Sequence, residues 1–206
     1  MITLKRFRRM ELHLRNAGFA HDIDWSETVP PATSPEEFAD HAIYVICNSG
    51  MKNSVAEPIY EACMAALLSG KRVRRVFGHP GKAKAIQKIW RDRERLFVAY
   101  LFATDPIKFL QRIPWIGPVT SYHLAKNLGA DVAKPDVHLE RLARRDGTTT
   151  HRLCQRLSRE TGYRVATIDT VLWRACAEGL LNSTTYERIG WKAAFNPSKL
   201  VPRDEG

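Results

Sequence analysis

Apolar residues recur along the chain at the three- and four-residue spacing of helices, and almost no segment alternates as a strand does. The clearest start is Ser34-Pro35-Glu36-Glu37, a capping box with proline at the first helical position. Gly70 and Gly129 stand where helices are expected to end. The pattern predicts a mainly α fold with a loop after residue 190. Helices are expected from residue 34 and over about 53–69, 80–90, 92–103, 106–112, 118–128, 137–145, 148–161 and 164–180.

The chain is strongly basic: 32 Lys and Arg stand against 22 Asp and Glu, a formal net charge of +10 in 206 residues. Such an excess attracts polyanions, and nucleic acid is the expected partner. The basic residues are spread along the chain and not gathered on one amphipathic helix, which argues against a membrane surface. No apolar run reaches the roughly 18 residues that a membrane span needs, and the first residues are basic too early for a signal peptide. We therefore expect a cytoplasmic protein with no membrane partner.

The four cysteines show no C-x-x-C pair, and each stands among apolar neighbours. This pattern is typical of reduced cysteines that pack in a core, and it does not favour a zinc or iron–sulfur site. We expect no metal site at Cys47, Cys63, Cys154 and Cys176.

The octapeptide Ile113-Pro114-Trp115-Ile116-Gly117-Pro118-Val119-Thr120 joins two predicted helices by a tight, glycine-containing turn. The first backbone N–H groups of a helix have no partner within the helix, and together with the helix dipole they favour an anion. A DNA phosphate fits this requirement. A corner in which Gly117 and Pro118 serve the geometry alone fits the same residues, and the octapeptide by itself does not separate the two interpretations.

A single carboxylate, Asp136, follows nineteen residues after Gly117, in Lys134-Pro135-Asp136-Val137-His138-Leu139. Asp directly before a helix is a common N-cap. A carboxylate held at a helix N-terminus also stays ionised at neutral pH. A fixed negative charge stabilises the oxocarbenium character that a deoxyribose acquires when its C1′–N bond breaks. Asp136 is therefore both a predicted cap and the candidate catalytic residue for excision of a base, with water attacking C1′.

Together these segments resemble the helix-hairpin-helix, Gly/Pro…Asp superfamily of DNA glycosylases. The superfamily's hairpin of the form Leu-Pro-Gly-hydrophobic-Gly is similar to residues 113–120, and its Asp-x-His at the start of a helix is similar to Asp136 with His138. The continuous resemblance covers residues 113–142, and residues 164–180 resemble the superfamily's late helix more loosely.

The resemblance implies a compact, two-lobed helical protein with a cleft between the lobes. One lobe, residues 34–130, would carry the helix-hairpin-helix at about 106–128, and the other, residues 1–33 and 131–206, would carry the catalytic Asp136. The implied protein is a monomer that binds double-stranded DNA containing a damaged or modified base and turns that base out of the duplex. The implied setting is DNA repair or phage defence, in a bacterial or phage-infected cell.

Three departures from the superfamily pattern change what it implies here. Trp115 replaces the first hairpin glycine, so the turn has a different backbone shape or presents an indole to the DNA. Val119 stands where bifunctional members have their Schiff-base lysine, which predicts a monofunctional glycosylase without β-lyase activity. The four-cysteine cluster of some relatives is absent, so neither an iron–sulfur cluster nor another cofactor is implied.

The resemblance places the DNA contacts at the turn and near the catalytic carboxylate. The candidate DNA-binding residues are Trp115, Ile116, Gly117, Val119, Thr120 and Lys134. Lys134 is also open to the role of a solvated lysine or of a stray lyase amine. The loop 47–53 corresponds to the one that helps fill the gap left by a flipped base, so Asn48 and Met51 are candidates for a wedge or base pocket. A polar, helix-ending loop is the alternative.

Other polar residues have simpler expected roles. His138 is expected to be structural, with a hydrogen bond inside its own helix. Further phosphate contacts are expected among Arg72, Arg74, Arg75, Lys82, Lys84, Lys88, Arg144 and Arg145.

Two rival functions remain open. Phages carry relatives of this fold that look like transferases acting on a modified thymine, and in such a protein Asp136 would do acid–base work. In a noncatalytic module that only binds DNA, Asp136 would merely cap its helix. Free base released from DNA separates the glycosylase from both.

Overall fold

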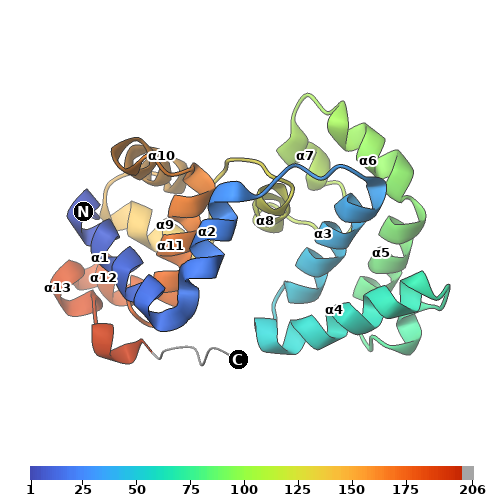
Figure 1. The fold of residues 1–206 in the computed structure, drawn as a ribbon, viewed down its shortest axis with the longest axis horizontal. Coiled ribbons are helices and arrows are strands. Elements are labelled where there is room, and N and C mark those ends of the chain that lie inside the picture. The colour runs from blue at the N-terminus through green and yellow to red at the C-terminus, as the bar shows by residue number, and fades with distance from the viewer. Residues whose placement is uncertain (201–206) are drawn as a thin grey trace. The chain divides into compact units, whose positions relative to one another are not determined.

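Residues 1–200 are described by the structure, a computed structural model, except for the side chain of residue 53. Every regular element in this part of the chain is helical, which confirms the expected mainly α fold (Figure 1). An isolated bridge between Leu181 and Phe195 is the only β-type pairing among these residues. The helices are α1 (Leu4–Leu14), α2 (Ala20–Thr28), α3 (Pro35–Asn48), α4 (Asn53–Leu68), α5 (Pro80–Arg91), α6 (Arg93–Leu101), α7 (Pro106–Leu110), α8 (Thr120–Asn127), α9 (Val137–Arg145), α10 (Thr150–Thr161), α11 (Val165–Ala177), α12 (Ser183–Ile189) and α13 (Trp191–Ala194). Short turns of other helix types are η1 (Arg15–Phe19), η2 (Val73–Arg75) and η3 (Pro197–Lys199).

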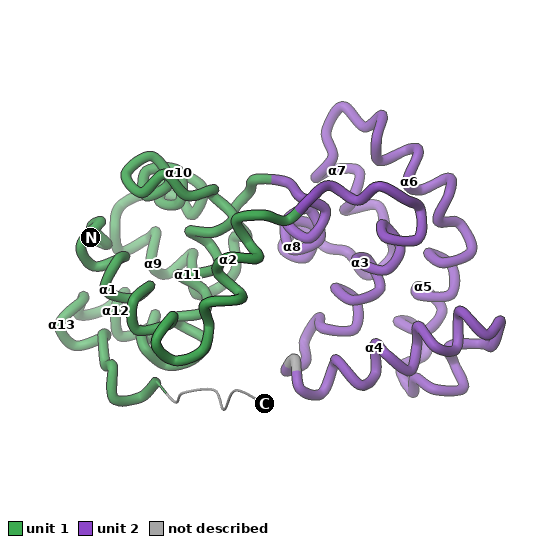
Figure 2. Tube along the Cα trace, in the orientation of Figure 1, with its two compact units in different colours: residues 1–29, 131–206 green, residues 30–130 purple. Residues whose placement is uncertain are grey.

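The chain forms two compact units (Figure 2). Unit 1 contains residues 1–29 and the chain from residue 131 onward, and unit 2 contains residues 30–130. The chain thus passes from unit 1 to unit 2 between residues 29 and 30, whereas the sequence predicted this boundary between residues 33 and 34. Close packing explains the difference, because a Cβ added at Gly129 would lie 2.7 Å from the backbone nitrogen of Pro31. This contact ties the Pro30-Pro31 segment to unit 2.

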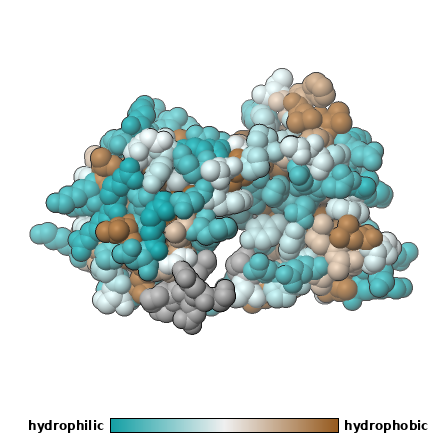
Figure 3. All heavy atoms as spheres, viewed as in Figure 1, coloured by the Kyte–Doolittle hydropathy of each residue, from teal (hydrophilic) through white to brown (hydrophobic). Residues whose placement is uncertain are grey.

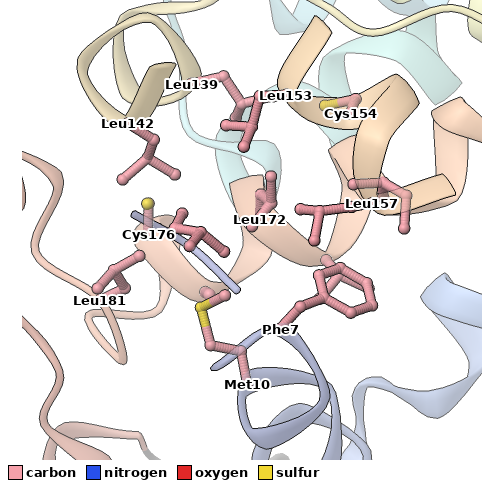
Figure 4. Packing of buried hydrophobic residues seen from close by; sticks show 14 of the residues in the cluster. Phe7, Met10, Leu139, Leu142, Leu153, Cys154, Leu157, Leu172, Cys176 and Leu181 are labelled. Carbon is pink, nitrogen blue, oxygen red and sulfur yellow. The ribbon is translucent and has the colours of Figure 1, made fainter. Parts of the chain in front are cut away.

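The core of unit 1 surrounds α11, which packs against α1, α2, α9 and α10. Figure 4 shows Leu139 and Leu142 of α9 directed into the same cluster of apolar side chains as Leu153 and Leu172. Both leucines of α9 are fully buried. The helix that follows Asp136 is therefore anchored by its apolar face, and its polar N-terminus stays at the edge of the core.

The expectation of a loop after residue 190 is wrong, because the end of the described chain forms α13 and η3. Trp191 and Phe195 stack with their ring centroids 4.5 Å apart and pack against the core of unit 1. Two aromatic side chains four positions apart bury a large apolar area on one helical face, which favours a helix over a loop. Helices α1 and α2, for which the sequence pattern was not interpreted, contribute Phe7, Met10 and Ile23 to the same core.

Helix α3 is central in unit 2, where it packs against α4, α5, α6 and α8. Its predicted start is confirmed, since the Ser34 hydroxyl accepts the Glu37 N–H at 3.1 Å. The Glu37 carboxylate in turn accepts the Thr33 N–H at 2.6 Å. The two expected glycine stops are also confirmed, with φ of 69° at Gly70 and 85° at Gly129.

Hydrophilic side chains cover much of the face of the molecule in Figure 3, and apolar side chains gather near the end of α6. Val98, Leu101 and Phe102 are exposed there. None of the sequence-predicted site residues belongs to this apolar patch.

Candidate functional site

Asp136 caps α9, as its position in the sequence predicts. Its backbone is extended, and its Oδ1 accepts the N–H groups of His138 at 2.9 Å and Leu139 at 3.1 Å. Within residues 1–200 no donor hydrogen-bonds its second oxygen, Oδ2. The side chain is partly buried. One carboxylate oxygen thus orients the group, and the other remains available to a ligand.

The loop that leads to Asp136 is fastened to α11 at two points. Asp169, a carboxylate of α11 with 2% of its surface exposed, accepts the Lys134 N–H at 2.8 Å. Asp131 accepts the N–H of Ala166, in the first turn of α11, at 2.9 Å. The Asp136 N–H donates to the Lys134 carbonyl at 2.8 Å. Contacts within unit 1 therefore fix the position of Asp136.

Asp169 is a functional candidate that the sequence analysis did not single out. The available signal was one acidic residue inside an otherwise apolar helical run, Ile168-Asp169-Thr170-Val171-Leu172. A carboxylate at a core position needs hydrogen-bond donors, because an unsatisfied buried charge is costly. The loop ahead of Asp136 supplies one of those donors.

His138 differs from expectation. Its Nδ1 lies 2.9 Å from the hydroxyl of Ser183, which is buried at the start of α12, so its side-chain partner is not in its own helix. A side chain on a helix surface can reach a neighbouring helix as well as residues of its own helix. Here the neighbouring helix, α12, supplies the partner of His138. His138 therefore links α9 to α12 within unit 1.

Cys176 of α11 lies close enough to Asp136 to feel its charge. Burial, followed by the negative charge of Asp136, raises the pKa of the Cys176 thiol to about 12. The thiol consequently stays protonated at neutral pH and does not act as a nucleophile. All four cysteines are buried and free, which confirms their expected place in the cores.

The turn between α7 and α8, in unit 2, is anchored by two buried isoleucines, Ile113 and Ile116. Because the Ile116 side chain is buried, only its main chain remains for contact with a ligand. The Gly117 N–H donates to the Thr120 hydroxyl at 2.7 Å, and the Gly117 carbonyl accepts the Ser121 N–H at 2.9 Å. The start of α8 is thus held by its own side chain and backbone.

The expected free amides of the turn are only partly found. Gly117 has its N–H occupied by Thr120, and Pro118 has none. For Val119 and Thr120, the described chain offers no acceptor to either N–H group. The amides able to hold a phosphate are therefore those of Val119 and Thr120. The Val119 side chain is itself exposed.

Trp115 takes the left-handed conformation that the replaced glycine would favour, with φ of 68°. It is the only residue other than glycine with positive φ in the described chain. Whether the turn differs in backbone shape from that of the superfamily stays a prediction. The indole is 46% exposed, meets the His79 ring edge-on at 4.9 Å, and lies where a Cβ on Gly81 would come within 2.7 Å.

Gly117 is the opposite case: a glycine at a position whose backbone conformation suits any residue. Its φ is not positive, and an added Cβ would meet only the Thr120 hydroxyl oxygen, at an ordinary 3.9 Å. Neither backbone conformation nor space within unit 2 requires glycine at this position.

The remaining predicted site residues fall in both units. Lys134, in unit 1, is partly buried, and its ammonium has no partner among the described residues. Asn48, at the end of α3 in unit 2, donates its amide to the Tyr44 carbonyl at 3.1 Å. Met51 is partly buried and follows Gly50, whose φ is 75°. These contacts describe a helix-ending loop and leave the wedge role of Asn48 and Met51 a prediction.

Several expected phosphate contacts have internal partners. Lys88 pairs with Asp92, and Arg74 and Arg145 donate to the Phe77 and Glu187 carbonyls. Lys82 is 5% exposed, its ammonium donates to the Ser49 carbonyl at 2.6 Å, and burial lowers its pKa. Lys82 lies on the buried face of α5, and its long side chain extends to the loop after α3. Arg144 pairs with Glu187 of α12. The expectation of a surface phosphate contact is wrong for Lys82.

Among the described residues, no group of three or more His, Cys, Asp or Glu is placed to hold a metal ion. No helix in this part of the chain is long and apolar enough to cross a membrane. Comparison of the chain with family models, with curated proteins and with solved structures found no match.

Proposed function

We propose that the protein is a monofunctional DNA glycosylase of the helix-hairpin-helix type, which hydrolyses the N-glycosidic bond of a damaged or modified base. The observation that carries the proposal is the state of Asp136. Two backbone amides orient Oδ1, and Oδ2 has no partner within the described chain. A carboxylate held this way is oriented before a substrate arrives, which is the condition for electrostatic catalysis.

The reaction follows from that arrangement. As the C1′–N bond of a flipped nucleotide breaks, the electron pair leaves with the base, and positive charge develops on the sugar. The Asp136 carboxylate stabilises this charge and accepts the proton of the water that attacks C1′. The departing base gains a proton, and an abasic site remains. Lys134 lies two residues before Asp136 in the loop and is proposed to contact a phosphate.

The turn supports DNA as the substrate. The unpaired amides of Val119 and Thr120 offer two donors at the start of α8, where the helix dipole favours an anion. Gly117 leaves its Cα open to close approach, although its own unit does not demand glycine there. In this proposal α7, the turn and α8 form the helix-hairpin-helix.

The product is expected to be an intact abasic strand. Val119 supplies no amine at the position where a Schiff-base lysine would stand, and Lys82, a lysine of unit 2 with a lowered pKa, is buried against Ser49. A β-lyase step needs an accessible amine nucleophile. The protein is therefore proposed to act without a cofactor and without covalent catalysis.

The test is Asp136→Asn in single-turnover base release. Asn is a good N-cap, so folding and DNA binding should stay near those of the wild type. Loss of the charge should raise the activation barrier by about 3 kcal/mol, which slows base release by roughly a hundredfold or more. Asp105→Asn is the matched control, since Asp105 caps α7 through the Lys108 N–H.

Base release should collapse in Asp136→Asn and remain intact in Asp105→Asn. Unchanged release by a folded Asp136→Asn protein eliminates Asp136 as the catalytic residue. A wild type that binds DNA and releases no base from any modified duplex favours the binding module, in which the cap at α9 is purely structural.

A further inference from the structure

A groove with basic walls runs between η2 and α5 in unit 2. It has a volume of about 580 Å³. Its floor contains Ala83 and Gln87, and the Gln87 side chain accepts the Val73 N–H at 3.0 Å, which fastens one wall to the other. Val73 is fully buried, so this wall is anchored in the core of the unit. The groove is thus a fixed feature of unit 2.

The side chains that line the groove carry one sign of charge. Five of them are cations and none is a carboxylate: Arg72, Arg74, Lys84, Lys88 and Arg91. Asp92, at the end of α5, pairs with Lys88 at 2.8 Å and with Arg91 at 2.8 Å. Arg72 and Lys84 are exposed and have no such carboxylate among the described residues. A polyanion would therefore find its strongest unpaired attraction at the η2 end of the groove.

The groove begins where the turn between α7 and α8 ends. Pro80 lines it, and the neighbours of Pro80 on both sides, His79 and Gly81, contact the Trp115 indole. The groove therefore lies close to Trp115 of the turn. A DNA strand held at the turn would reach the groove past this indole.

We propose that this groove binds the sugar-phosphate backbone of the DNA strand that continues past the turn. The inference rests on DNA being the partner, as in the proposed function. Helix α5 has 12 residues and so a length of about 18 Å at 1.5 Å per residue. With one phosphate per roughly 3.4 Å of rise along a strand, the groove accompanies about five nucleotides. Arg72 and Lys84 are assigned to the phosphates first, because neither is paired with a carboxylate of the described chain.

The experiment measures binding of the full chain to an unmodified duplex as salt rises from 50 to 200 mM. The double variant Arg72→Ser with Lys84→Ser removes two cations from the groove. The control, Arg188→Ser with Lys192→Ser, removes the same charge from exposed positions of unit 1. Each lost phosphate contact lowers the slope of log K against log salt by about 0.9, so the groove variant should lose about 1.8 and the control much less.

A second arm shortens the duplex. Removal of about five base pairs from a duplex just long enough for full binding should weaken the wild type more than the groove variant, since that variant has lost two of the five cations that contact those phosphates. Equal slopes in the groove variant and the control, or equal sensitivity of both to shortening, overturn the proposal. Groove-dependent binding to phosphatidylserine vesicles without groove-dependent binding to DNA also overturns it.

The two proposals fail separately. If the wild type releases base and the groove variant behaves as the control does, the groove assignment is wrong and the glycosylase assignment stands. If no base is released but the slope of log K against log salt falls in the groove variant and not in the control, the groove binds DNA in a protein that does not excise bases.

Discussion

The loop ahead of Asp136 and the turn between α7 and α8 differ in how well the folded protein accounts for their residues. In the loop, the groups that fix the backbone have internal partners: Asp131 accepts the Ala166 N–H, Asp169 accepts the Lys134 N–H, and Asp136 caps α9. In the turn, residue type and conformation disagree. The position with positive φ carries a tryptophan, and the glycine next to the helix has an ordinary φ and open space.

This difference separates two kinds of constraint. The loop residues are explained by folding, so a catalytic role for Asp136 depends on the one oxygen that folding leaves unused. At the turn, left-handed backbone costs Trp115 about 1–2 kcal/mol, although its indole packs against His79 and Gly81, and glycine is not needed at 117. A ligand that approaches the turn closely would account for the glycine.

Of the variants that compare the loop with the turn, Asp169→Ala is expected to have the largest effect. It removes the buried carboxylate that accepts the Lys134 N–H, which should reduce the free energy of unfolding by about 1–3 kcal/mol. Denaturant unfolding measures the loss, and hydrogen exchange of the Lys134 amide locates it. Asp169→Asn keeps an acceptor oxygen and should restore part of the stability and most of the amide protection. If the Lys134 amide stays protected in Asp169→Ala, the loop is not held by this carboxylate.

A smaller effect separates stability from binding at Gly117. Gly117→Ala should leave the free energy of unfolding within about 0.5 kcal/mol, since the added Cβ meets only Thr120 at van der Waals distance. It should weaken DNA binding by on the order of tenfold if a phosphate packs against the Cα, because the added methyl group would push the phosphate away from the Val119 and Thr120 amides and cost a charged hydrogen bond. Gly78→Ala is the control, because Gly78 also has ordinary φ and open space. Affinity equal to that of Gly78→Ala would make the turn a simple corner.

The smallest effect compares two replacements of Trp115. Both Trp115→Gly and Trp115→Ala remove the indole from His79 and Gly81, but only glycine accepts φ of 68° without a steric cost. The glycine variant should be the more stable, because it avoids the steric cost of positive φ. The difference should be only roughly 0.5 kcal/mol, because the larger entropy of glycine in the unfolded state offsets part of that gain. Thermal unfolding of the pair measures the difference. An alanine variant clearly more stable than the glycine variant would mean that the turn does not keep its left-handed residue.

Local chemistry explains what the sequence predicted well. Asp136 as a cap, the start of α3 at Ser34 and the glycine stops all depend on neighbours within a few residues, so the pattern contains the necessary information. The bond from Asp169 to Lys134 spans 35 positions, and that between His138 and Ser183 spans 45. Such partners depend on how helices pack, which the pattern of a single element does not specify.

Lys82 illustrates the same limit from the other side. Its charge predicted a surface position, whereas four apolar residues of α5 (Ala83, Ala85, Ile86 and Ile89) bury the face beside it. The Ser49 carbonyl, 33 positions away, satisfies the ammonium. A polar side chain can therefore be buried when a distant loop offers an acceptor, and only the tertiary structure reveals the acceptor.

The central claim is that the chain releases a base from DNA by means of Asp136 and without a covalent intermediate. Mass spectrometry of the products from a panel of duplexes with damaged and modified bases tests it most directly. We expect free base and an intact abasic strand from at least one duplex, with no protein–DNA adduct after borohydride treatment. A base that gains mass while it stays attached to the strand would instead identify a transferase, and an efficient borohydride adduct would show a covalent intermediate.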